Sequence, residues 1–270
     1  MDFNISLKDE AKDFFLYSYF GIVSKDMYNE LCRDEKERNI PSYEDFVITK
    51  CIDRAYLDFN RTLLFKEEYK GDTKKKKNKR KKALSHLKDT IRISIVDLID
   101  NKIDDYNKWH NQLCQALLEE AEKGNFLIEK EKEMPTQKSK VFYYGQAQKW
   151  VNMTIKYVWL LGLIPERFEK ELHIPVDRYL IEALLPNCAV PTKNDSEIKP
   201  TAFQADKIVP WSEWNKINYN DFQSCCKQSN KEKNKLPLVW ENRIWIETAA
   251  KYSLEEYFTE SNEMETSDNP

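Results

Sequence analysis

Three observations in the sequence predict an all-α protein. The chain of 270 residues contains only 5 glycines, few for a fold rich in strands and turns or for glycine-loop nucleotide binding. Apolar residues recur at spacings of three and four along most of the chain, which is the period of an amphipathic helix. Hydrophobic residues make up 41% and aromatic residues 13% of the chain, enough for a large core. We therefore expect one helical domain at 1–260, built as two packed lobes with a cleft between them.

In the N-terminal half, four segments carry the helical period. Residues 11–25 begin the series, and residues 43–60 come directly after Pro41-Ser42, a favourable helix start. The segments 84–100 and 105–123 continue the pattern with alternating apolar and charged faces. The last two open the central group of helices, which we expect to span about 83–186.

The C-terminal half continues with four more segments. Residues 146–162 carry a long apolar side, and a shorter helix begins at Asp177. The segments 213–228 and 237–258 are rich in tryptophan and need a large apolar partner, so we expect them to pack onto the N-terminal helices. Loops are expected at 74–82, 130–140 and 185–203, and the acidic residues 261–270 are expected to be a disordered tail.

Charge and cysteine usage indicate the kind of protein. The net charge is −3, yet residues 74–82 read KKKKNKRKK. Such a run is either a solvated loop or a loop that contacts phosphate. The six cysteines lack CxxC spacing and are expected to be reduced thiols, with no zinc site and no metal. The N-terminus has no apolar signal core and no stretch reaches the length of a membrane span, so we expect a cytoplasmic protein without a membrane partner.

Two residues suggest chemistry. Lys149 lies in the first turn of its predicted helix, where the positive end of the helix dipole and partial burial favour a neutral, nucleophilic amine. Asp177 comes after Ile174-Pro175, which holds the chain extended, and occupies a helix N-cap position. The alternatives are a solvated lysine and a carboxylate that only caps its helix.

Together these two elements resemble the helix-hairpin-helix DNA glycosylases, and most closely the archaeal 8-oxoguanine glycosylase branch. The resemblance covers residues 143–185, with Gly145-Gln146-Ala147-Gln148-Lys149 upstream of His173-Ile174-Pro175-Val176-Asp177. The apolar-Pro-Gly-x-Gly hairpin of the commoner family members is absent, so any helix-hairpin-helix element here is degenerate.

The resemblance implies a DNA glycosylase with β-lyase activity that acts on a modified base in duplex or single-stranded DNA, without a cofactor. Lys149 would attack C1′ and form a Schiff base, while Asp177 would stabilise the positive charge at C1′ and help to deprotonate the ammonium. Tyr143 and Tyr144 are candidates for the wall of a base pocket. Further candidates for contacts with DNA or the extruded base are Gly145, Gln146, Gln148, Trp150, His173, Trp211 and Trp214. The oligomeric state stays open.

Two other interpretations remain. Arg80 and His86 have a spacing that resembles the motif of HEPN-like ribonucleases, which are also all-α. The chain would alternatively be a non-catalytic helical module whose lysine run binds nucleic acid or an acidic partner.

Overall fold

The structure is a computed structural model that describes residues 11–33, 40–128, 141–193, 207–231 and 235–267. The all-α prediction is confirmed: the described residues form ten α-helices and no strand, apart from two isolated β-bridges, Phe65 with Leu127 and Thr192 with Ile208. None of the described helices combines the length and the apolar character that crossing a bilayer requires.

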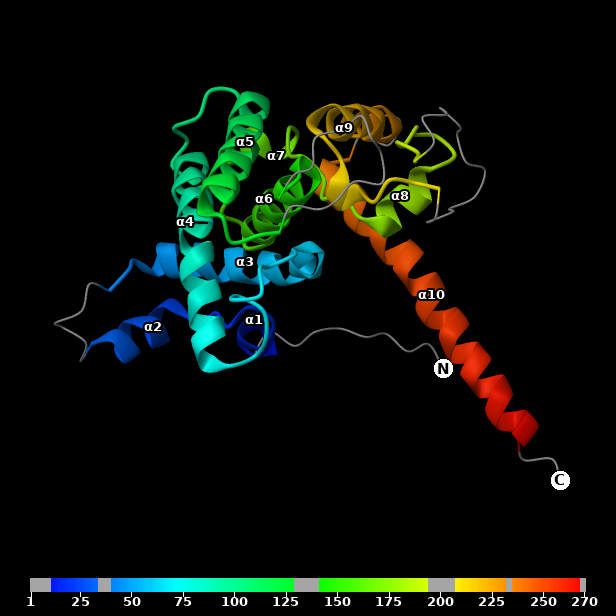
Figure 1. Cartoon of the computed structure of the whole chain (residues 1–270), viewed down its shortest axis with the longest axis horizontal. Coiled ribbons are helices and arrows are strands. Elements are labelled where there is room, and N and C mark those ends of the chain that lie inside the picture. Colours follow the sequence, from blue (N-terminus) through cyan, green and yellow to red (C-terminus); the bar gives the residue numbers. More distant parts are fainter. Residues whose placement is uncertain (1–10, 34–39, 129–140, 194–206, 232–234, 268–270) are drawn as a thin grey trace.

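The first five helices cover the N-terminal half of the chain (Figure 1). They are α1 (Lys12–Phe20), α2 (Lys25–Cys32), α3 (Tyr43–Phe59), α4 (Lys74–Ile99) and α5 (Tyr106–Gly124), with a short 3₁₀ turn, η2 (Asn60–Thr62), after α3. The helix expected over 11–25 ends early, at Phe20, because Gly21 adopts a left-handed φ of 70°. Helix α2, which the sequence pattern did not predict, begins at Lys25 after its N-cap Ser24. Ser42 caps α3 as the sequence predicts, accepting a bond from the amide of Asp45 at 3.0 Å.

The remaining helices form the centre and the C-terminal part of the molecule. They are α6 (Tyr144–Leu160), α7 (Glu166–Glu169), α8 (Arg178–Leu184), η3 (Trp211–Glu213), α9 (Lys216–Lys231) and α10 (Pro237–Ser267). Helix α10 is the longest and extends away from the body at its C-terminal end (Figure 1). It reaches Ser267, so the helix continues into the segment for which composition predicts disorder.

Helix α6 lies at the centre of the molecule. Of its 17 residues, 14 are buried, because α3, α5, η3 and α9 all pack against it. A helix covered on all sides is expected to be apolar all round. In α6, however, Gln146, Gln148, Lys149 and Asn152 are also buried, so each of these polar groups needs a partner inside the protein.

The lysine run at 74–82 is not a loop. It forms the first turns of α4, whose N-cap Thr73 accepts a hydrogen bond from the amide of Lys76 at 3.4 Å. Lysine and arginine are good helix formers, and the next part of the helix buries Leu84 and Leu87 on one face. The tertiary packing of that face extends the helix back through the charged run, which stays on the surface.

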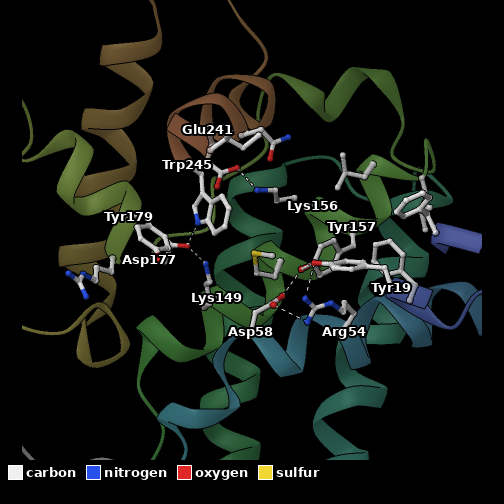
Figure 2. A pocket seen from close by; sticks show the side chains of 18 of the residues that line it. Tyr19, Arg54, Asp58, Lys149, Lys156, Tyr157, Asp177, Tyr179, Glu241 and Trp245 are labelled. Carbon is white, nitrogen blue, oxygen red and sulfur yellow. Dashed lines mark hydrogen bonds and ion pairs between the residues drawn. The ribbon is translucent and has the colours of Figure 1, made fainter. Parts of the chain in front are cut away.

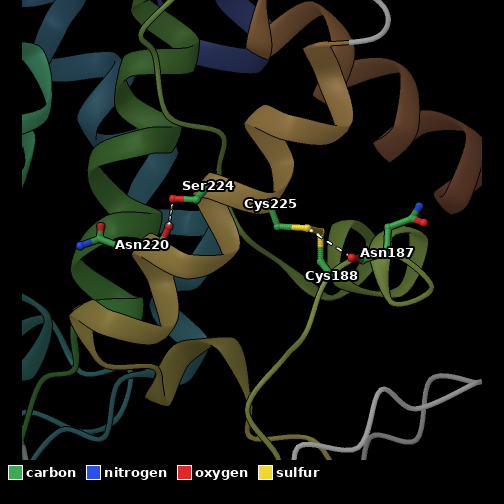
Figure 3. The surroundings of a disulfide bond; sticks show 5 residues. All are labelled: Asn187, Cys188, Asn220, Ser224 and Cys225. Atoms are coloured by element: carbon green, nitrogen blue, oxygen red, sulfur yellow. Dashed lines mark hydrogen bonds between the residues drawn. A yellow bond between two sulfur atoms is a disulfide. The ribbon is translucent and has the colours of Figure 1, made fainter.

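The cysteine prediction is wrong for two residues. Cys188, after α8, and Cys225, in α9, form a disulfide with their Cα atoms 5.8 Å apart (Figure 3). The other four cysteines are free, and three of them are buried. The pairing depends on how α8 and α9 meet in space, which the spacing of 37 residues in the sequence does not reveal.

Several predicted features fall outside the described residues. The loop predicted at 130–140 lies in the segment 129–140. Residues 194–203 of the third predicted loop are also outside the described chain. Residues 185–193, the first part of that loop, come after α8 and form no regular helix, as predicted. Thr192 forms an isolated β-bridge with Ile208.

Candidate active site

Lys149 is positioned by the way α6 begins. The amide of Gly145 donates to the carbonyl of Trp214 at 2.9 Å, and a Cβ on Gly145 would lie 1.9 Å from the carbonyl oxygen of Trp211. Only glycine allows this close approach of two backbones. The side chain of Gln146 closes the same end of the helix by accepting from the amide of Tyr143 at 2.9 Å. The first turn of α6 is therefore held against the segment that precedes α9, with Lys149 one turn further on.

Asp177 is positioned by the extended segment before α8. Residues 173–176 have no regular secondary structure, as Ile174-Pro175 predicts, and Asp177 is the N-cap of α8. Its Oδ1 atom accepts from the amide of Leu180 at 3.1 Å, which is the capping bond. Its Oδ2 atom is left to face the interior, where it accepts from the indole Nε1 of Trp245 at 2.9 Å.

The Oδ2 atom of Asp177 also accepts from Nζ of Lys149 at 3.0 Å (Figure 2). Lys149 is only 4% exposed, so it is not the solvated lysine of the alternative interpretation. Burial alone would raise the pKa of Asp177, but the Lys149 ammonium and the bonds from Leu180 and Trp245 hold it below its ordinary value. Asp177 is therefore a carboxylate at neutral pH, paired with a buried ammonium.

This pair lies in the wall of a cavity of about 1150 Å³. Side chains from α1, α3, α6, α8, η3 and α10 line it. Six of them are cationic and three are anionic: Lys12, Arg54, Arg61, Lys149, Lys156 and Arg178, against Asp58, Asp177 and Glu241. Aromatic rings form much of the rest: Phe15, Tyr19, Phe20, Tyr157, Tyr179, Trp211 and Trp245. The excess of cations and the aromatic walls suit a ligand that is both anionic and flat.

A second lysine and carboxylate pair lies in the same cavity, and the sequence interpretation missed it. Lys156, two turns after Lys149 on α6, donates to Glu241 of α10 at 2.7 Å (Figure 2). Glu241 is 1% exposed, and burial raises its pKa although Lys156 opposes the shift. One signal was available: Glu241 is a single acid inside the apolar run PLVWENRIWI, and Trp245 lies four positions later on the same helix face.

A polar cluster forms another part of the wall (Figure 2). Arg54 pairs with Asp58 at 3.1 Å and donates to the hydroxyl of Tyr19 at 2.9 Å. Tyr157 donates to Asp58 at 2.7 Å, and burial together with the nearby Asp58 carboxylate raises the pKa of Tyr157. Tyr157 is thus a neutral hydroxyl that joins α6 to α3 and α1.

Most residues predicted to contact DNA lie in the interior. Gln148 donates to the carbonyl of Gly145 at 2.9 Å, and Gln146 donates to the carbonyl of Thr62 at 2.8 Å. Trp150 is fully buried and donates to the carbonyl of Ile52 at 3.1 Å. None of these residues lines the cavity. Their hydrogen-bonding groups are used to hold α6 in place.

Three further residues predicted to contact DNA lie in different places: His173, Trp214 and Trp211. His173 is buried between Tyr219, whose hydroxyl lies 2.8 Å from Nδ1, and Asn107, whose Oδ1 lies 2.8 Å from Nε2. Trp214 is buried and donates to the carbonyl of Val209 at 2.9 Å. Trp211 alone among the predicted DNA contacts lines the cavity, with its ring centroid 5.9 Å from Nζ of Lys149. Of the two tyrosines expected at the wall, neither Tyr143 nor Tyr144 lines it.

The features of the competing interpretations lie elsewhere. Arg80 and His86 are both on α4 and do not line the cavity, and Arg80 donates to the carbonyl of Tyr69 at 3.3 Å. Within the described ranges, no three histidine, cysteine, aspartate or glutamate side chains gather in a way that could hold a metal ion.

No protein-family model, curated protein sequence or solved structure matches this chain.

Proposed function

We propose that this protein is a DNA glycosylase with lyase activity, in which Lys149 is the nucleophile and Asp177 the catalytic carboxylate. One observation carries the proposal: a buried lysine faces an N-cap carboxylate across 3.0 Å at the wall of a large cavity with a cationic excess. An amine that attacks carbon and an anion that stabilises a cationic sugar are the two groups that the reaction needs.

The reaction begins at the glycosidic bond. The C1′–N bond breaks with its electron pair going to the base, which leaves after taking up a proton. Positive charge develops at C1′ and is stabilised by Asp177. The neutral amine of Lys149 bonds to C1′, and opening of the sugar ring with loss of a proton from nitrogen gives the Schiff base. Loss of a C2′ proton then expels the 3′ phosphate by β-elimination.

The ion pair between Lys149 and Asp177 must separate before the amine can attack C1′. Lys149 is an ammonium hydrogen-bonded to Asp177, and an ammonium has no lone pair to attack carbon. Asp177 takes this proton and passes it to the departing base, so that it is a carboxylate again as positive charge develops at C1′ in place of the ammonium. The cost of separating the pair is offset because one positive charge is exchanged for another.

The cavity supplies binding in the same proposal. An extruded nucleotide brings a phosphate and a flat base, which cationic and aromatic side chains accept. Trp211 and Trp245 flank the ion pair and are candidates to contact the base. Arg61 is an exposed cation that lines the cavity, suited to a phosphate.

The test is borohydride trapping on duplex and single-stranded oligonucleotides that carry a panel of modified bases or an abasic site. The proposal requires a covalent protein–DNA band with the unaltered protein, loss of the band in Lys149→Gln, and its retention in the matched control His86→Ala. DNA binding without any trapped band would support the non-catalytic module. RNA cleavage that depends on His86 would support the ribonuclease.

A further inference from the structure

A second cavity, of about 580 Å³, lies apart from the Lys149–Asp177 pair and shares no lining residue with the first cavity. Its walls come from residues 170–174, the C-terminal half of α9, and residues 235–240 at the start of α10. Its volume lies within the range of about 300–1,000 Å³ that is usual for small-molecule sites. Nothing in the proposed reaction uses it.

Two buried polar atoms in this wall have no hydrogen-bond partner. They are Nε1 of Trp240 and Oδ1 of Asn230, and among the described side chains they are the buried nitrogen and oxygen atoms that lack one. Trp240 is 4% exposed and Asn230 8%. The amide nitrogen of Asn230 is already used, since it donates to the carbonyl of Lys235 at 2.8 Å. Both residues line the cavity. A buried donor or acceptor without a partner is costly, so a ligand that forms hydrogen bonds with these two atoms would remove that cost.

The charge of the wall has one sign. Lys170, Lys227 and Lys235 line the cavity, and no aspartate or glutamate does. In the part of the chain that the structure describes, none of the three lysines forms an ion pair. Burial lowers the pKa of Lys227, although Glu171 nearby opposes the shift. A bound anion would stabilise this partly desolvated ammonium.

The rest of the wall is apolar, and it adjoins a helix start. Leu172, Ile174 and Leu236 line the cavity beside Trp240. Pro237, also in the wall, is the first residue of α10. A matching ligand has a negative charge, a flat apolar body, and both a donor and an acceptor on that body.

We propose that this cavity binds a nucleoside monophosphate, either free or as the phosphorylated end of a nucleic-acid strand. The phosphate lies among Lys170, Lys227 and Lys235. The base lies against the apolar wall, with an acceptor on its edge facing Nε1 of Trp240 and an amino group facing Oδ1 of Asn230. This site does not depend on glycosylase activity at Lys149, and its test is separate.

The test is calorimetric titration of the full chain, at low ionic strength, with nucleoside monophosphates, the matching nucleosides and inorganic phosphate. At least one monophosphate is expected to bind at least about tenfold more tightly than its nucleoside and than phosphate, as charge-assisted and base-edge contacts together predict. A 5′-phosphorylated oligonucleotide, compared with its unphosphorylated form, distinguishes a strand end from a free nucleotide.

Three variants make the test specific. Trp240→Phe removes the unpartnered N–H, so it should weaken binding about tenfold without lowering the melting temperature. Lys227→Gln should weaken binding of monophosphates but not of nucleosides. Lys82→Gln, which removes one charge from α4 outside the cavity, should change nothing. The proposal is overturned if no monophosphate binds, if nucleosides bind as well as their monophosphates, or if Lys227→Gln leaves the affinity unchanged.

Discussion

The Nζ atom of Lys149 lies 3.0 Å from Oδ2 of Asp177, although 28 positions separate the two residues in the chain. Asp177 uses its other oxygen, Oδ1, to cap α8 through the amide of Leu180. The same carboxylate thus fixes a helix start with one atom and faces a buried amine with the other. Capping accounts for the position of Asp177, and the oxygen that capping leaves over accepts from Lys149 and Trp245.

Asp177→Asn separates these two roles. Asparagine caps a helix about as well as aspartate, so α8 should form and the circular dichroism should be unchanged. The new amide group would face two donors, Lys149 and Trp245, in place of an anion, which should lower the melting temperature. Single-turnover base excision should fall by about 100-fold or more, because the anion beside C1′ is gone. Full activity would show that Asp177 is only a cap.

Replacing Lys149 should lower the free energy of unfolding by an amount that depends on the new side chain. Lys149→Met leaves the buried carboxylate of Asp177 without its cation, which typically costs about 3–5 kcal/mol. Lys149→Gln keeps a donor within reach of Asp177 and should cost less. Denaturant unfolding of both variants measures the difference. Equal and small losses would mean that the pair contributes little to the fold.

Gly145→Ala tests how the start of α6 is held. The added Cβ would lie 1.9 Å from the carbonyl oxygen of Trp211, a backbone atom that cannot turn away. We expect a loss of about 1–3 kcal/mol or more from overpacking, together with a displaced Lys149 and reduced trapping. An unchanged melting temperature would show that α6 and η3 can separate without cost.

Stability should fall in mild acid because of two buried histidines. Burial lowers the pKa of His110 from 6.5 to about 4, and burial together with His110 lowers the pKa of His173 as well. Below pH 6.5 the unfolded chain therefore takes up protons that the folded protein does not. The stabilisation is complete above pH 6.5 and is lost as the pH falls toward 4.

The expected slope is about 1.4 kcal/mol per pH unit for each histidine that stays neutral. Denaturant unfolding at pH 7, 6 and 5 measures it. His110→Gln should flatten the slope, since the residue then no longer titrates. Stability that is independent of pH over this range would contradict the neutral state of both rings.

The elements that could be predicted from the sequence are those whose causes are local. Pro175 restricts its neighbour, Asp177 caps the helix that begins at Arg178, and the period of apolar residues marks α3, α5 and α6 before any tertiary contact is known. The burial of Lys149 was not predictable in this way. On the helix wheel it shares a polar face with Lys156, and the cavity wall forms where Asp177, Glu241 and other distant residues meet that face.

The features that the sequence missed or predicted wrongly are those that tertiary packing decides. Glu241 and Trp245 reach the site because α10 packs against α8, and no spacing in the sequence encodes that contact. The same holds for the disulfide between Cys188 and Cys225. The lysine run was misassigned because its charge suggests a loop, whereas its helix propensity and the apolar residues after it decide the outcome.

The residue that carries the trapped DNA decides whether Lys149 is the nucleophile. After borohydride reduction, protease digestion and mass spectrometry locate the adduct. The proposed mechanism predicts a reduced sugar adduct on Lys149, with none on Lys156 although Lys156 lines the same cavity. An adduct on Lys156 or in the lysine run at 74–82, with Lys149 unmodified, would contradict it.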